Sequence, residues 1–277
     1  MTLKERNMFF KIGLCIATAA ITVIAASSAV VFRVNPQAYP AVLEEALQRP
    51  EYLITGILEA SAYGAFAAAL ISVGYSFAAG ICIYRFFEKT PSPEILYIAF
   101  FVMSFAFEAC RVMIPFIKVN EFPVIYLVIT GRIALFGRYL GIFSLLAASI
   151  FASGFNIQEQ KYTIIILVSA SIIFAIQAPI DGFSWNTALN VTMGYSALFN
   201  AVEMSIAAIT LIGFLISTLM RGSNAYLFIS AGVLLVFLGR NFLFNADTPV
   251  ASILGALFLV AGTWLMCTRL HGVYLWL

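Results

Sequence analysis

Eight long apolar stretches constrain this chain more than any other feature of its sequence. A helix that crosses the hydrocarbon core of a bilayer needs about 20 consecutive, mostly apolar residues, and these stretches have that length. They are too long for barrel strands and lack the alternation of such strands. The sequence therefore predicts an all-α fold, a polytopic transmembrane helix bundle. Its spans are expected at about 9–32, 61–84 (with an earlier start near Leu53 left open), 95–117, 123–151, 162–180, 191–220, 226–245 and 251–270.

The composition excludes several classes of protein. Apolar residues make up 62% of the chain and charged residues 10%, against about 45–50% and about 25% in soluble domains. A soluble enzyme, a disordered chain and a disulfide scaffold are excluded, and the net charge of +2 is too small to indicate a nucleic-acid partner. The connections are short, so residues 1–277 are interpreted as a single transmembrane domain. A short helix near residues 41–48 is expected to lie on the outer surface.

The distribution of Lys and Arg predicts the orientation. If the N-terminus is inside, eight of these residues lie on the cytoplasmic side and three on the other side. We therefore expect both termini to be cytoplasmic, in a multi-pass protein of the bacterial inner membrane. The alternative is a cleaved signal peptide ending near Ser27–Ala29, which leaves seven helices. The first apolar stretch is longer than the usual segment of about 7–15 residues in a signal peptide, which favours a retained helix.

Small residues at regular spacing predict how the helices pack. Lipid tails are as apolar as leucine, so helices in a bilayer associate through close contact at small residues. Gly137 and Gly141 form a GxxxG pair in the fourth span. Glycines two helical turns apart in the seventh and eighth spans predict a close hairpin. Packing within the chain is the favoured interpretation, and homodimerisation is the alternative.

Charged residues inside the predicted spans are the strongest indication of a functional site. Each ionisable side chain at mid-bilayer costs about 2.5–3.5 kcal/mol on insertion scales. With a rise of about 1.5 Å per residue, most of these charges fall in the outer half of the membrane. Glu108 and Arg111 are three residues apart and can pair on one helix. The predicted ligand-binding residues are the six intramembrane charges and two neighbouring amides: Arg111, Arg132, Arg138, Arg240, Glu108, Glu203, Asn200 and Asn241.

Four arginines against two glutamates leave an excess of +2, or of +1 if Glu59 at the outer entrance of the second span joins them, and this excess allows two interpretations. In the first, the excess arginines line an outward-facing cavity that binds an anionic small molecule or a lipid headgroup, because the planar guanidinium fork matches carboxylate and phosphate. The protein would then act in transport or sensing. In the second, the charges form structural ion pairs in a non-catalytic membrane subunit that assembles with another membrane protein.

The sequence lacks the residues that several common catalytic and cofactor-binding sites require. The only histidine is His271, which excludes bis-histidine haem and a Ser-His-Asp triad. The four cysteines are dispersed, and no nucleotide-binding glycine motif occurs. We expect no cofactor, no metal and no catalytic residue, although Glu108 or Glu203 acting as a base in an intramembrane enzyme is a minor alternative.

Trp185 is expected to anchor an outer loop at the membrane surface.

Overall fold

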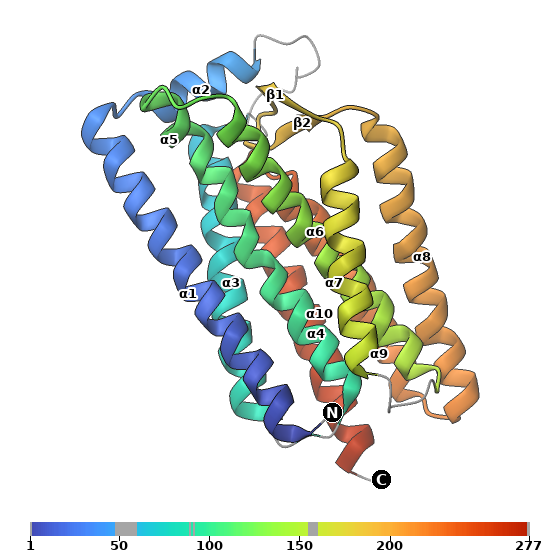
Figure 1. Cartoon of the computed structure of the whole chain (residues 1–277). Coiled ribbons are helices and arrows are strands. Elements are labelled where there is room, and N and C mark those ends of the chain that lie inside the picture. The colour runs from blue at the N-terminus through green and yellow to red at the C-terminus, as the bar shows by residue number, and fades with distance from the viewer. Residues whose placement is uncertain (1, 48–59, 89, 91, 155–159, 276–277) are drawn as a thin grey trace.

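The computed structural model of the chain describes residues 2–47, 60–88, 90, 92–154 and 160–275. The protein is all-α and 84% helical. Within the described ranges, eight helices are long and apolar enough to cross a membrane. These helices run alongside one another in one bundle, and both chain termini lie at the same end of it (Figure 1). The prediction of a multi-pass helical membrane protein is confirmed, whereas the side of the membrane on which the termini lie stays a prediction.

The element bounds follow the predicted spans with local shifts. One span is continuous in space but is built from three helical segments, α4, η1 and α5, of which η1 is a 3-10 helix. The elements are α1 (Leu3–Val34), α2 (Ala38–Leu47), α3 (Ala62–Phe87), α4 (Pro93–Ser104), η1 (Phe105–Val112), α5 (Met113–Val119), α6 (Ile125–Ala152), α7 (Gln160–Gln177), β1 (Ile180–Trp185), β2 (Val191–Met193), α8 (Ser196–Arg221), α9 (Ala225–Phe244) and α10 (Pro249–Leu275).

The connection between the fifth and sixth spans corrects the sequence prediction. The fifth span was expected to reach residue 180 and the sixth to begin at residue 191, but β1 and β2 form an antiparallel hairpin there. Pro179 disfavours helical backbone before it and has no N–H to continue a helix. Polar side chains then bond the local backbone: Asp181 accepts from the Phe183 N–H at 3.0 Å, and Asn186 accepts from the Asn190 N–H at 2.9 Å.

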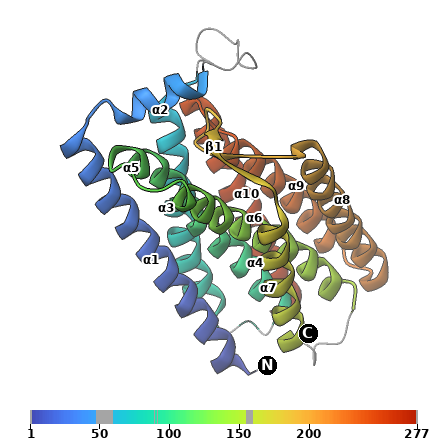
Figure 2. The ribbon, with the colours of Figure 1, turned by 45° about the horizontal axis from the view of Figure 1, so that its top comes forward.

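The predicted surface helix is α2, which begins three residues earlier than expected. It lies with the β-hairpin at the end of the bundle opposite the termini (Figure 2). Trp185 is 3% exposed and its Nε1–H donates to the Val42 carbonyl at 3.0 Å. The prediction that Trp185 anchors a loop in the headgroups is therefore wrong, because its ring joins the hairpin to α2. Gln48 at the end of the predicted helix, and the earlier start near Leu53, fall outside the described residues.

The span Pro93–Val119 lies at the centre of the bundle and is the most buried of the eight. Helix α6 packs against α4 and η1, as well as α7 and α8. A Cβ at Gly137 would lie 2.9 Å from the Ser104 carbonyl oxygen, and one at Gly141 would lie 2.5 Å from the Ser104 Oγ. Only glycine permits this approach, so the GxxxG pair makes a contact within the chain, as predicted.

Helices α9 and α10 form the close hairpin that the glycine spacing predicted. A Cβ on Gly239 would lie 2.8 Å from the Gly255 carbonyl oxygen, and one on Gly262 would lie 2.6 Å from the Gly232 carbonyl oxygen. The two backbones thus touch at both levels, with no side chain between them.

Candidate functional site

The charged site begins in η1, where the central span changes its helical geometry. In a 3-10 helix the side chains at i and i+3 eclipse one another, and runs longer than three or four residues are uncommon. Here the 3-10 segment has eight residues and carries Glu108 and Arg111. Arg111 Nη1 lies 3.5 Å from Glu108 Oε2, and both side chains are 1% exposed. The ion pair predicted from their spacing is confirmed.

Glu108 also binds a second arginine, which comes from α6. Arg138 donates from Nε to Oε1 of Glu108 at 2.8 Å and from Nη2 to Oε2 at 2.9 Å. This is the bidentate arrangement of a guanidinium and a carboxylate, the strongest form of such a pair. One buried carboxylate is therefore shared by two arginines from neighbouring elements.

Arg111 directs its remaining donors to backbone carbonyls rather than to acids. Its Nε donates to the Ala188 oxygen at 2.9 Å, and its Nη2 donates to the same atom. Its Nη1 donates to the Leu243 oxygen at 3.1 Å, and Nη2 also lies 3.4 Å from the Ala246 oxygen. The Arg111 side chain thus joins η1 to the turn of the β-hairpin and to the C-terminal end of α9.

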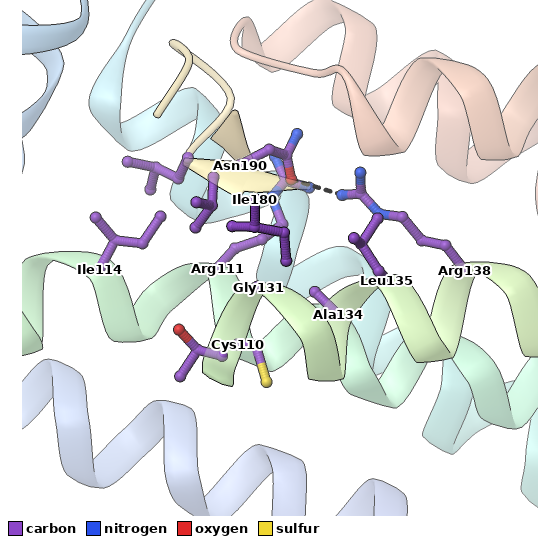
Figure 3. Close-up of a pocket in the computed structure, with 12 residues that line it drawn as sticks. Cys110, Arg111, Ile114, Gly131, Ala134, Leu135, Arg138, Ile180 and Asn190 are labelled. Carbon is purple, nitrogen blue, oxygen red and sulfur yellow. Dashed lines mark hydrogen bonds between the residues drawn. The ribbon is translucent and has the colours of Figure 1, made fainter. Parts of the chain in front are cut away.

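Asn190, in the same hairpin, completes this arrangement. Its Oδ1 accepts from Arg138 Nη2 at 2.5 Å, and its Nδ2 donates to the Phe244 carbonyl at 2.8 Å. Figure 3 shows the Arg138 guanidinium pointing at Asn190, with Arg111 close by. The sequence analysis missed Asn190 because the sixth span was expected to begin one residue later. A cluster of amides between two apolar stretches, at residues 186 and 190, was the signal for it.

A second ion pair extends the site toward α8. Arg240 of α9 donates from Nη1 to Glu203 Oε2 of α8 at 2.8 Å. The guanidinium carbons of Arg138 and Arg240 lie 4.6 and 4.7 Å from the centroid of the Phe244 ring. Phe244, which the sequence analysis also missed, therefore joins the two ion pairs through cation–π contacts.

The expected excess of charge was two, or one with Glu59, which lies outside the described residues. Three arginines and two glutamates come together within the spans, which leaves +1. Asp247, between α9 and α10, is close enough to Arg111 to attract it, which brings the sum to zero. We call these six residues the outer charged cluster, where outer means toward the end of the bundle opposite the termini: Glu108, Arg111, Arg138, Glu203, Arg240 and Asp247.

Three of the predicted site residues make no hydrogen bond or ion pair with this cluster among the described residues. Arg132 forms no ion pair with any described residue. Asn200 is exposed on α8, and the exposed Asn241 accepts a hydrogen bond from Asn245 at 3.0 Å. Five of the eight predicted residues therefore converge, and these three do not.

Some buried polar atoms near the cluster have no partner. Arg240 Nε, the Tyr139 hydroxyl and Arg132 Nε make no hydrogen bond with described residues. Tyr139 is fully buried and lies near both Glu203 and Arg240. Buried polar atoms are almost always satisfied, by water where protein does not reach them. These atoms are available to hydrogen-bond water or another small polar group.

A cavity beside the cluster is much smaller than the one expected. It has a volume of about 30 Å³ and lies between η1, α6 and the hairpin, lined by Arg111, Arg138 and Asn190 among others (Figure 3). A single water needs about 10–15 Å³ of such volume, so the cavity accommodates one or two waters. The hairpin forms one wall of this cavity, through Ile180, Leu189, Asn190 and Val191.

No family model, curated protein or solved structure matches this chain. Its function must therefore be inferred from the site itself. Among the described residues, no group of three or more His, Cys, Asp or Glu side chains is placed to hold a metal ion. What the arrangement offers chemically is a set of guanidinium donors that face oxygen atoms in the half of the bundle away from the termini.

Proposed function

We propose that this integral membrane protein binds an anionic group, a carboxylate or phosphate of a small solute or a lipid headgroup, at the outer charged cluster, in transport or sensing. The supporting observation is the partner of Arg111. Two adjacent donors of its guanidinium, Nε and Nη2, both meet one carbonyl oxygen, that of Ala188. This pair of donors is the one that binds carboxylate or phosphate oxygens bidentately.

The hairpin oxygens occupy the positions that ligand oxygens would take. Ala188 offers its carbonyl to Arg111, and Asn190 offers its side-chain oxygen to Arg138. Both belong to the turn between β1 and β2, at the outer end of the bundle. An anion larger than water gains these donors when the turn moves outward. Apparent affinity then equals the intrinsic affinity scaled by the fraction of molecules with the turn displaced.

The test uses Asn190→Ala, which removes the oxygen that competes for Arg138 and one bond that holds the turn to α9. Inorganic phosphate and succinate are the probes, and the readout is thermal stabilisation of the purified protein at constant ionic strength. We expect Asn190→Ala to be stabilised at lower probe concentrations than the unaltered protein. Asn245→Ala, at an exposed asparagine near the same end of α9, is the matched control and should behave as the unaltered protein does.

A second variant tests whether the arginines bind the probe. Replacing Glu108 and Arg138 together by Gln removes one negative and one positive charge, so the net charge is kept, and Arg111 retains its backbone carbonyl partners. We expect this double variant to lose probe-induced stabilisation. If neither probe stabilises the unaltered protein or Asn190→Ala, or if the double variant is still stabilised, the proposal is wrong.

The closed ion pairs favour a second candidate, a non-catalytic membrane subunit. Glu108 and Glu203 are both paired, and Arg111 has carbonyl partners for its donors. Helix α8 also buries few of its 26 residues, namely Ile206, Thr210, Phe214 and Ser217, so most of its apolar surface faces lipid or a partner. Purification in mild detergent should then recover a stoichiometric membrane partner or a homodimer, whereas a monomer would count against this candidate.

A further inference from the structure

A second polar site lies at the opposite end of the bundle, where both termini are found (Figure 1). A groove of about 730 Å³ separates the turn between α8 and α9 from the last turns of α10. Arg221 and Arg269 line it from two different helices, together with Ser223, Tyr226 and Thr268. Its volume is within the range of about 300–1,000 Å³ that small-molecule sites have.

The two arginines differ in whether a carboxylate lies close to them. Arg221 donates to the Tyr226 hydroxyl at 2.7 Å and to the Phe151 carbonyl at 3.2 Å, and it lies 3.7 Å from the buried carboxylate of Glu94. Its charge is therefore balanced by one acid. Glu94 also accepts from the Tyr274 hydroxyl at 2.9 Å, so its own oxygens are engaged inside the bundle.

Arg269 has no such balance. Its guanidinium carbon lies 4.4 Å from the centroid of the Phe228 ring, and no described carboxylate lies within ion-pair distance of it. The residue is exposed. The groove thus carries a net positive charge from Arg221, Arg269 and Glu94.

Exposed apolar side chains next to the groove indicate that it lies at the level of the lipid headgroups. Apolar side chains of α8 and α9 next to it are strongly exposed: Leu219 by 83%, Met220 by 72% and Leu227 by 52%. In a membrane these residues contact acyl chains, which places the two arginines at the level of the headgroups. Basic pockets between helices at this level bind the phosphates of anionic lipids.

We propose that this groove binds the phosphate of an anionic phospholipid from the leaflet that faces the termini. Arg269 supplies the uncompensated charge, and the hydroxyls of Ser223 and Thr268 lie along the same groove as polar contacts. The aromatic ring of Phe228 holds the Arg269 guanidinium in place. This proposal concerns the other end of the molecule and does not depend on the outer charged cluster.

The experiment compares the full-length protein with phosphatidylglycerol, phosphatidylcholine or inorganic phosphate. Lipids are added to the protein in detergent, and native mass spectrometry counts the bound molecules as the lipid is titrated. We expect phosphatidylglycerol to be retained and phosphatidylcholine not. Arg269→Gln should weaken that retention about fivefold, the effect of one arginine near an anionic surface. Arg85→Gln, at an exposed arginine on the same end but outside the groove, is the matched control.

Ser223→Asp is a second variant that preserves the local fold. Its carboxylate still accepts the Ala225 N–H that the serine oxygen accepts at 3.3 Å, but it places a negative charge in the groove. It should weaken phosphatidylglycerol binding as Arg269→Gln does. Equal retention of both lipids, or retention unchanged in both variants, overturns the proposal. Displacement of the lipid by inorganic phosphate at equal concentration also overturns it, because the ligand is then a soluble anion.

Discussion

Glu108 holds two arginines at once, which makes it the most consequential residue of the outer charged cluster. Its oxygens receive Arg138 at 2.8 and 2.9 Å and Arg111 at 3.5 Å. Both ion pairs lie in the bundle interior, where the Glu108 and Arg111 side chains are each 1% exposed. Removing the carboxylate leaves the guanidinium groups facing each other without a counter-charge.

We therefore predict that Glu108→Gln destabilises the protein by about 3–5 kcal/mol, the cost of breaking a buried ion pair on one side. Unfolding of the detergent-solubilised protein, followed by circular dichroism, measures the change. Glu45→Gln is the control, because its pair with Lys118 is 52% and 39% exposed and should contribute about 0–1 kcal/mol. Equal effects of the two substitutions would contradict the structural assignment of Glu108.

The residues of this cluster differ in how far the sequence could predict them. The Glu108–Arg111 pair follows from spacing on one helix. The pairing of Arg138 with Glu108 depends on how η1 and α6 pack, which spacing within one helix does not determine. Asn190 was harder to predict than Arg138. Its side chain reaches Arg138 because the hairpin turns back over the bundle. Tertiary contacts, rather than local pattern, decided those two positions.

At the scale of helices, the contact between α9 and α10 depends on glycine. The Gly239 position faces the Gly255 carbonyl, and an added Cβ would approach it to 2.8 Å. We predict that Gly239→Ala lowers stability by about 1–3 kcal/mol, the usual cost of overpacking. The midpoint of thermal unfolding measures this loss of stability.

Gly74→Ala is the control, because a Cβ there meets nothing within 4 Å. Alanine at that position should stabilise α3 by about 0.5–1 kcal/mol.

Helix α1 gives a second prediction at this scale. Arg6 is 5% exposed and donates to the Phe87 carbonyl at 3.3 Å and to the carbonyls of Glu88 and Thr90, which follow the end of α3. If α1 is retained, Arg6→Gln removes these charged hydrogen bonds and should lower stability by about 1.5–3 kcal/mol. Lys4→Gln, at an exposed position, should have little effect. If the first span is a cleaved signal peptide, neither substitution changes the unfolding of the mature protein.

The helical elements were predictable to different degrees for a physical reason. Membrane spans are set by the thickness of the bilayer, so length and apolar content alone located all eight. The hairpin at 180–193 lies outside that constraint. Its apolar residues extended the neighbouring spans in the sequence interpretation, whereas the polar turn around Asn186 prevents a helix there. The 3-10 geometry of η1 was also beyond prediction, because apolar periodicity does not distinguish it from an α-helix over eight residues.

For the whole molecule, the two ends of the bundle carry different charge. The end with the termini carries Lys4, Arg85, Lys161 and the arginine pair of the groove, whereas the end with α2 and the hairpin has Arg33 and Lys118 among its described residues. Positive charge in short connections is retained on the cytoplasmic side during insertion. The same asymmetry favours cytoplasmic termini, so we expect the groove of Arg269 at the inner leaflet and the outer charged cluster below the opposite surface.

This orientation can be tested with two single cysteines in a background where the four native cysteines are changed to alanine. Phe183→Cys lies in the hairpin at a position that is 75% exposed, and Asn224→Cys lies in the exposed turn between α8 and α9. In intact bacterial cells, a membrane-impermeant maleimide should label the first and not the second, which becomes reactive once the membrane is permeabilised. The reverse pattern means that the termini face outward, and the groove would then meet the outer leaflet. Labelling of both in intact cells contradicts a bundle in which these two turns lie at opposite ends.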